Sequence, residues 1–394
     1  MGTKEIVTGN YAQSFAAKLA RVQVISAYPI TPQTTIVEKL AEFVSEGELD
    51  ADFIKVESEH SALQACLSAS AVGARTYTAT SSQGLLLMHE LLFWAAGQRA
   101  PVVMGVVNRA VAPPWSIWTD HTDTMAQRDT GWIQIYCESN QEVLDTTLMA
   151  FRFAERDDVR LPAMVTEDAF YLSHTVEAVD IPEQREVDDF LPPRPRTHVL
   201  EIGKTGRLGS FMGPDLYMEF RYSLAEAMAQ ARRAILDVEA DFERHFRRSY
   251  AGFVELYKAD GADAVLVTMG TATSTAREVV DDLRSRGKKV GLAKLRVFRP
   301  FPAKEMRDLA GLTDRLGVLD RSYGFGHGGP AYLEVVGSVA GGPRKPLFRN
   351  FIGGLGGRDL TPPVIEGMFD ALLAGDGDGD EVTWPDLHRA EEGT

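Results

Sequence analysis

Four chemically capable side chains lie where the sequence predicts the ends of strands: Thr31, Glu59, Ser82 and Arg109. Glu59 follows a strand expected at 53–56 and comes just before a helix of small residues expected at 61–72. A carboxylate in this place can accept a hydrogen bond from a ligand, but it can also cap the free N–H groups of the helix. Taken alone, Glu59 is better explained as a cap, so its interpretation depends on its neighbours.

The neighbours favour a ligand site. Arg109 follows a buried apolar run, where a guanidinium beside other polar strand ends is better explained as an anion clamp than as a surface charge. Thr31 lies between Pro29 and Pro32, which exclude helix and stiffen the loop after an apolar strand. A stiff loop of this kind suits a binding site and a simple turn equally well.

These side chains require a scaffold that brings strand ends together. Strands are expected at 22–27, 53–56, 75–80 and 102–107, and helices separate them. The alternation predicts an α/β fold with a doubly wound parallel sheet, whose strands end at one common edge. Ligands of such sheets bind at that edge. We therefore expect the four polar side chains to share one site.

The remaining chain divides into a long loop, a linker and a second α/β unit. The loop at 112–130 holds two tryptophans and two prolines, which indicates a lid or a packed interface. Its acidic residues and His121 are expected to hydrogen-bond within the loop rather than to bind a metal. Residues 176–196 are acidic and proline-rich and are expected to form an extended linker or arm. Strands and helices alternate again from about residue 262.

Composition excludes several classes of protein. The net charge of −15 argues against nucleic acid or an anionic membrane as partner, and the apolar runs are too short to cross a bilayer, so we expect a soluble, cytoplasmic protein. The two cysteines, Cys66 and Cys137, are too few for an iron–sulfur cluster, which needs about four thiolates. The Gly-Asp repeat fits no calcium or diphosphate–metal motif, so residues 376–394 are expected to be a flexible acidic tail.

Several separate motifs, in this order along the chain, resemble those of one known family. They are Ala27-Tyr28-Pro29-Ile30-Thr31-Pro32-Gln33, Glu57-Ser58-Glu59-His60-Ser61-Ala62, Thr80-Ser81-Ser82-Gln83-Gly84-Leu85, Asp120-His121-Thr122-Asp123, Arg128-Asp129-Thr130-Gly131-Trp132 and Gly353-Gly354-Leu355-Gly356-Gly357-Arg358-Asp359. The chain resembles, over nearly its whole length, the alpha subunit of multi-subunit 2-oxoacid:ferredoxin oxidoreductases. Within that family it looks closest to pyruvate:ferredoxin oxidoreductase (pyruvate synthase).

The resemblance implies a domain organisation. Residues 1–245 would form the pyrimidine-binding domain of a thiamine-diphosphate fold, including a proline-rich arm at 176–222. Residues 250–375 would form a transketolase-C-terminal-like α/β domain, followed by the acidic tail.

The resemblance also implies a role for each strand end. Glu59 matches the glutamate that hydrogen-bonds the aminopyrimidine ring and so helps the cofactor to lose its C2 proton. Arg109 matches the arginine that binds the carboxylate of the 2-oxoacid, and Thr31 matches a residue that hydrogen-bonds the substrate. The remaining cofactor-binding residues are expected to be Ser82, Pro29 and Ile30.

The resemblance also implies partner subunits, which would supply what this chain lacks. A beta subunit is expected to hold Mg²⁺ and the diphosphate, a ferredoxin-like subunit the 4Fe–4S clusters, and a gamma subunit to complete the complex; no metal site is expected in this chain. Coenzyme A is expected as cosubstrate, and ferredoxin or an NAD-reducing module as electron acceptor.

The predicted reaction is the oxidative decarboxylation of pyruvate to acetyl-CoA. One alternative is the same reaction on an aromatic or branched 2-oxoacid, for example phenylglyoxylate. Another is a non-catalytic scaffold, against which the joint presence of Thr31, Glu59 and Arg109 argues.

Overall fold

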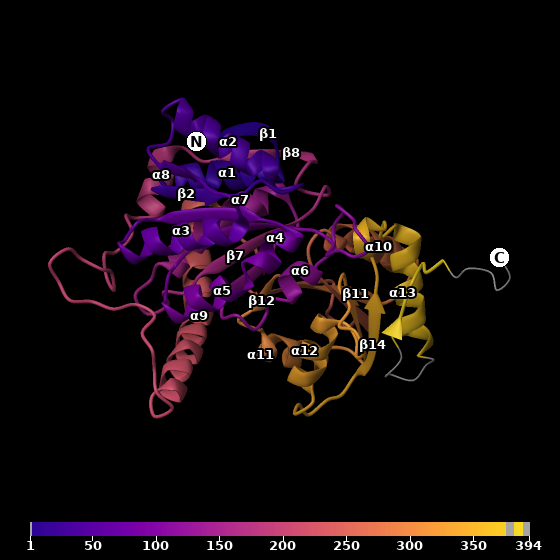
Figure 1. Cartoon of the computed structure of the whole chain (residues 1–394). Helices are drawn as coiled ribbons and strands as arrows, with labels where there is room; N and C mark the ends of the chain where they lie inside the picture. Colours follow the sequence, from indigo (N-terminus) through magenta and orange to yellow (C-terminus); the bar gives the residue numbers. More distant parts are fainter. Residues whose placement is uncertain (1, 376–381, 389–394) are drawn as a thin grey trace.

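A computed structural model of the chain describes residues 2–375 and 382–388. Within them the strands form two larger sheets, one mainly from each half of the chain, and a two-stranded ribbon. Helices cover both faces of each larger sheet, as Figure 1 shows for the indigo-to-magenta N-terminal half and the orange-to-yellow C-terminal half. The chain is therefore an α/β protein with parallel sheets, as the sequence predicts.

The first sheet is doubly wound. From β2 the chain places β3 on one side and β4 on the other, so the winding direction changes between β2 and β4. Neighbouring strands are parallel except at one edge, where β12 is antiparallel to β6. Loops that leave the two strands at such a switch point diverge and open a crevice for ligands. In strand order the sheet consists of β12 (Val297–Arg299), β6 (Ile133–Tyr136), β7 (Ala163–Asp168), β5 (Val103–Asn108), β4 (Thr76–Thr80), β2 (Val24–Ala27) and β3 (Asp52–Lys55).

Helices bury both faces of this sheet, which explains why its central strands are continuous apolar or β-branched runs. One face packs against α1 (Gly9–Leu19), α2 (Thr34–Ser45), α7 (Asn140–Ala154), α8 (Gln184–Phe190) and α9 (Tyr217–Phe246). The other face packs against α3 (Glu59–Ala71), α4 (Ser82–Leu87) and α5 (His89–Gly97). The short α6 (Thr122–Met125) lies between β5 and β6 along the chain.

The second sheet repeats the pattern. Its strands are parallel except for β9, which is antiparallel to β11. In strand order they are β15 (Val382–Thr383), β14 (Leu347–Ile352), β13 (Arg315–Asp320), β10 (Ala264–Thr268), β11 (Val290–Leu295) and β9 (Val254–Tyr257). One face packs against α10 (Ala272–Ser285) and α13 (Pro362–Ala374), and the other against α11 (Ala303–Ala310) and α12 (Pro330–Val339).

The two halves of the chain are joined through β12. This strand follows β11 closely in sequence, yet it pairs with β6 in the first sheet. A buried charge cluster strengthens the junction, because Glu142 of α7 accepts hydrogen bonds from Lys294 Nζ and Arg296 Nε, each at 2.7 Å. The short β12 is not predicted from the sequence, where it reads as a continuation of the second unit.

The prediction that residues 176–196 form an extended linker is wrong for the first part of this segment. There β8 (Val176–Ile181) pairs antiparallel with β1 (Thr3–Thr8), and α8 places Phe190 against Phe242 of α9 with ring centroids 5.2 Å apart. The prolines that indicated a linker flank these elements rather than interrupt them. Residues 191–216 do form an irregular arm, which projects from the body near α9 in Figure 1.

The prediction of a flexible acidic tail at 376–394 is wrong at residues 382–383. Val382–Thr383 form β15, which pairs in parallel with β14, whereas residues 376–381 and 389–394 lie outside the described residues. None of the helices described here is long and apolar enough to span a bilayer.

Candidate active site

The predicted site residues lie around the switch point of the first sheet. Thr31 lies in the loop between β2 and α2, Glu59 begins α3, Ser82 begins α4, and Arg109 directly follows β5. All four positions therefore lie at the edge where the parallel strands of this sheet end.

The loop at 28–33 is pinned from inside the protein. Gln33 Nε2 donates a hydrogen bond to Ala79 O in β4 at 2.8 Å, and Asn10 Nδ2 of α1 donates to Pro32 O at 2.7 Å. These bonds hold the loop in one place and agree with the predicted stiffness. The predicted site residues of this loop that keep exposed or half-buried surface are Pro29, Ile30 and Thr31.

Glu59 is buried, with a carboxylate that lacks a partner. The residue is 7% exposed, and in the described part of the chain no hydrogen bond or ion pair reaches its side chain. Glu59 is not the cap of α3, because the Ser58 hydroxyl accepts the capping hydrogen bond from Ser61 N at 3.2 Å. Buried polar groups nearly always have a hydrogen-bond partner, so this carboxylate is well suited to accept a hydrogen bond from a donor outside the chain. A ring N–H of a bound cofactor is such a donor.

Gly84 of α4 leaves the space that Glu59 needs. A Cβ atom on Gly84 would lie 2.6 Å from Glu59 Oε1 and 2.5 Å from Thr80 Oγ1, closer than real Cβ contacts allow. A larger residue at position 84 would therefore displace the carboxylate. The sequence shows Gly84 only as part of a motif and does not reveal this close approach.

Arg109 is a buried cation bonded to neutral oxygen atoms. Its guanidinium donates to Thr31 O at 2.8 Å, Ser116 O at 3.2 Å and Gln83 Oε1 at 3.1 Å. Among the residues that the structure describes, no carboxylate forms an ion pair with it, and burial lowers the pKa of Arg109 from its ordinary value. The charge of Asp123 opposes this shift, but its carboxylate bonds the Arg109 backbone N–H and not the guanidinium. A desolvated guanidinium that no carboxylate contacts is a natural binding group for an anion.

The structure brings Thr31 and Arg109 into direct contact, through the carbonyl oxygen of Thr31. The Thr31 hydroxyl has no hydrogen-bond partner within residues 2–375 and 382–388 and remains available to a ligand. Gln83 connects this pair to the rest of the site, since it contacts Arg109 and is followed directly by Gly84.

Ser82 is fully buried and its hydroxyl is engaged. Oγ donates to Ala110 O at 2.6 Å, and the backbone adopts a left-handed φ of 48°. In this structure Ser82 supports the chain that carries Arg109; a direct contact with a cofactor stays a prediction.

Asp123 organises the strand ends, a role that the sequence does not reveal. Its carboxylate accepts hydrogen bonds from Ser82 N at 3.0 Å, Arg109 N at 3.1 Å and Asn108 Nδ2 at 2.8 Å. Burial raises the pKa of Asp123 to about 6 although these bonds oppose the shift. The sequence predicts that Asp123 bonds within its own loop, and its bond from Thr124 N at 2.8 Å agrees. Its other side-chain bonds leave the loop, because they reach Asn108 of β5 and the residues that follow β4 and β5.

A second buried network lies where the two halves meet. Asp168 at the end of β7 pairs with His121 Nε2 at 2.7 Å and with Arg321 Nη1 at 2.9 Å, and it accepts a hydrogen bond from Thr271 N at 3.0 Å. Burial alone would raise the pKa of Asp168, but Arg321 and His121 hold it below its ordinary value. The prediction that His121 hydrogen-bonds within its own loop is therefore wrong for its ring, which bonds the end of β7. The network fixes the loop after Asp120 against the second half, and its distant members could not be paired from sequence.

Comparisons with known proteins identify the family of the chain. The family described as pyruvate flavodoxin/ferredoxin oxidoreductase, thiamine-diphosphate-binding, matches residues 15–240, and pyruvate:ferredoxin oxidoreductase core domain II matches residues 262–365. Ketoisovalerate oxidoreductase subunit VorA of Pyrococcus furiosus is 50% identical over 390 residues, 98% of each chain. Pyruvate synthase subunit PorA of Methanocaldococcus jannaschii is 50% identical over 368 residues, 93% of this chain and 94% of that one.

A solved structure shows the same fold. It is the 2-oxoglutarate:ferredoxin oxidoreductase from Magnetococcus marinus with 2-oxoglutarate, coenzyme A and succinyl-CoA bound, with a TM-score of 0.73 and 20% identity. The match covers 94% of this chain and 65% of that chain. Because one family profile matches more than half of the chain and the archaeal relatives match nearly all of it, the chain belongs to the family of 2-oxoacid:ferredoxin oxidoreductase alpha subunits.

Proposed function

We propose that the chain binds the pyrimidine half of thiamine diphosphate at Glu59 and the carboxylate of a 2-oxoacid at Arg109, for oxidative decarboxylation that forms an acyl-CoA. The observation that carries this proposal is the buried Arg109 cation with neutral partners, placed beside Thr31 and joined through Gln83 to the turn next to Glu59.

Each side chain has a distinct task. An arginine has five N–H donors, and the hydrogen bonds of Arg109 use three of them, so one hydrogen on each Nη remains for the substrate carboxylate. The free Thr31 hydroxyl donates to the substrate beside it. Glu59 accepts a hydrogen bond from the pyrimidine ring and shares a proton with it. When bound, thiamine diphosphate supplies the electron sink for decarboxylation.

Two roles at the edge of the site belong to the same proposal. Pro29 and Ile30 lie in the pinned loop and would contact the cofactor ring with their apolar surfaces. Ser82 would act on the cofactor mainly by shaping the turn before Gln83. The division into a pyrimidine domain at 1–245 and a second domain at 250–375 is likewise proposed. In this division β12 belongs to the second domain in sequence but forms an edge strand of the first sheet.

The substrate is proposed to be a short aliphatic 2-oxoacid. Pyruvate is the first candidate, and ketoisovalerate is the second because a relative named for it is equally similar to this chain. The aromatic alternative, phenylglyoxylate, receives no support from the relatives reported above.

Mg²⁺, the diphosphate and the 4Fe–4S clusters are proposed to belong to partner subunits, and ferredoxin to accept the electrons. Both cysteines are buried and free, and burial raises the pKa of Cys66 to about 12 and that of Cys137 well above its ordinary value, so neither favours the thiolate that a cluster needs. Within the described residues no three metal-binding side chains of the His, Cys, Asp or Glu type gather in one place.

The testing experiment uses the complex purified through an affinity tag on this chain. Coenzyme-A-dependent reduction of a viologen dye is measured with pyruvate, 2-oxoisovalerate, 2-oxoglutarate and phenylglyoxylate. We expect a high kcat/KM with pyruvate or 2-oxoisovalerate. Activity with none of the four acids, in a complex that contains bound thiamine diphosphate, would refute the proposed function.

A further inference from the structure

The loop that orients Arg109 is held in turn by the second half of the chain. We name residues 110–119 the clamp loop. Its Ser116 O accepts the hydrogen bond of Arg109 Nε at 3.2 Å, and Ala110 N donates to Trp118 O at 3.0 Å to close the base of the loop. The clamp loop is therefore one of three supports that set the direction of the guanidinium, beside Thr31 O and Gln83 Oε1.

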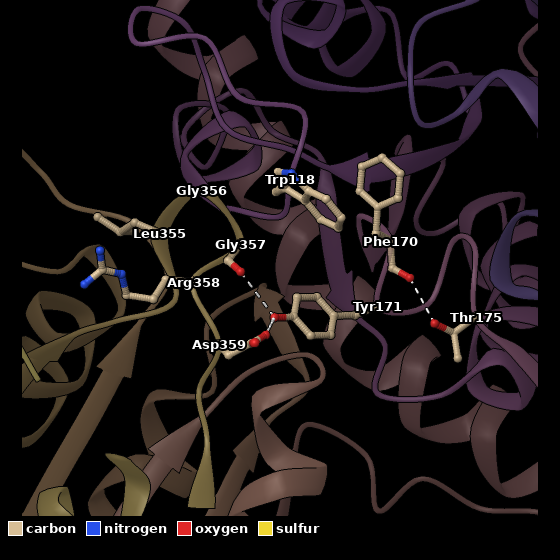
Figure 2. A pocket seen from close by; sticks show the side chains of 9 residues that line it. All are labelled: Trp118, Phe170, Tyr171, Thr175, Leu355, Gly356, Gly357, Arg358 and Asp359. Carbon is tan, nitrogen blue, oxygen red and sulfur yellow. Dashed lines mark hydrogen bonds between the residues drawn. The ribbon is translucent and has the colours of Figure 1, made fainter. Parts of the chain in front are cut away.

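Trp118 anchors the clamp loop on its outer side. Its ring packs against that of Phe170, with centroids 4.4 Å apart and planes tilted by 45°, and forms one wall of a cleft of about 620 Å³. Figure 2 shows the opposite wall, which is the turn from Leu355 to Asp359 contributed by the second half.

Gly357 is the contact point between this turn and the clamp loop. Its N–H donates to Thr119 O at 2.8 Å, and its carbonyl oxygen accepts a hydrogen bond from Tyr171 Oη at 3.3 Å. A Cβ on Gly357 would lie 2.3 Å from Trp118 Cβ, a distance that requires one backbone to move. Gly356 differs, because a Cβ there would meet Ser116 Oγ at an ordinary 3.7 Å.

We propose that Gly357 is a positioning residue for 2-oxoacid binding: by letting the turn touch Trp118, it sets the clamp loop and thereby the orientation of the Arg109 guanidinium. This inference rests on the proposed function of Arg109. It goes further in assigning substrate affinity to a contact made by the second half of the chain. A misplacement of about 1 Å at a binding group can cost roughly 100-fold in rate.

The test measures steady-state kinetics of the tagged complex with Gly357→Ala. We expect KM for the 2-oxoacid to rise about 10- to 100-fold, with kcat, KM for coenzyme A and thiamine diphosphate affinity close to those of the unsubstituted complex. Gly287→Ala is the control for backbone strain, because its φ of 83° matches the 80° of Gly357 and nothing lies within 4 Å of the added Cβ. Gly356→Ala is the control for the turn itself.

A second substitution separates the clash from other effects. In a Trp118→Gly background the obstructing Cβ is absent, so adding Gly357→Ala should raise KM no further. Should Gly357→Ala fail to assemble, Tyr171→Phe carries the test, because it removes the hydrogen bonds from the Tyr171 hydroxyl to Gly357 O and to the Asp359 carboxylate of the same turn without adding volume. It should raise the same KM about threefold.

The outcomes separate the two levels of the argument. An unsubstituted complex that is inactive on every 2-oxoacid defeats the proposed function. An active complex in which Gly357→Ala behaves like Gly287→Ala, or loses kcat with an unchanged KM, overturns the positioning role alone.

Discussion

Replacing Arg109 by alanine should lower kcat/KM for the 2-oxoacid by roughly 30- to 4,000-fold. Truncating one partner of a buried, hydrogen-bonded charge pair costs about 2–5 kcal/mol, and each 1.4 kcal/mol is about tenfold. Arg109 meets the condition, since it is buried and keeps two N–H donors for a carboxylate once Thr31, Ser116 and Gln83 are bonded.

Arg109→Lys should give an intermediate loss. A lysine keeps the positive charge, but its single ammonium cannot span Thr31, Ser116 and a bidentate carboxylate together. Arg99 provides the matched control, because it also donates to backbone carbonyls, those of Val159 at 2.6 Å and Arg160 at 3.2 Å, and burial also lowers its pKa. Arg99→Ala should leave kcat/KM unchanged.

The assay is coenzyme-A-dependent dye reduction by each variant complex over a range of 2-oxoacid concentrations. Two measurements report whether each variant complex is intact. The partner subunits should copurify with the tagged chain, and the complex should still bind thiamine diphosphate. An intact Arg109→Ala complex with an unchanged kcat/KM would refute the clamp. Equal losses for Arg99→Ala and Arg109→Ala would show that the effect is not specific to the site.

Three further outcomes are expected. Glu59→Gln should cut kcat at least about 100-fold while the complex still assembles, because it removes the proton-sharing carboxylate and little volume; an active variant would contradict the role given to Glu59. Gly84→Ala should weaken thiamine diphosphate binding roughly 10- to 150-fold by displacing Glu59 Oε1, whereas Gly97→Ala, whose added Cβ meets nothing within 4 Å, should bind normally in the same titration. Glu167 of β7 is buried, and neither of its carboxyl oxygens has a hydrogen-bond partner within the described residues. Glu167→Gln should stabilise the protein more at pH 8 than at pH 5, on the order of 1–3 kcal/mol at the higher pH. Burial raises the pKa of Glu167 well above its ordinary value, so the folded state binds the proton more tightly and loses stability as pH rises; urea unfolding at the two pH values measures the difference, and an equal effect at both would contradict it.

The fold was predictable from sequence where the strands are buried on both faces. Apolar runs such as those of β5 and β10 read as strands without ambiguity, and their alternation with helices is specific. β1 and β12 escaped prediction for a different reason. The first is largely exposed and the second is three residues long, so neither carries a periodic signal, and both are fixed by partners far away in sequence.

The site was predictable as a set of strand ends and not as a network of contacts. Sequence order places Thr31 and Arg109 at one sheet edge, but only folding shows that the Thr31 carbonyl and the Arg109 guanidinium are bonded. Asp123 lies 41 residues from Ser82, yet its carboxylate accepts a hydrogen bond from the Ser82 N–H. No local sequence pattern encodes this pairing. Gly357 is a similar case, because the need for glycine there comes from the close approach of Trp118, which the sequence does not show.

The exchange of β12 has a consequence for dissecting the protein into parts. A fragment that ends near residue 245 would contain the whole proposed pyrimidine domain and yet leave one side of β6 without its neighbour. Such an unprotected edge offers free N–H and C=O groups to other chains and invites aggregation. The boundary suggested by the helices and the boundary required by backbone pairing therefore differ by more than fifty residues, and a well-behaved fragment has to reach beyond Arg299.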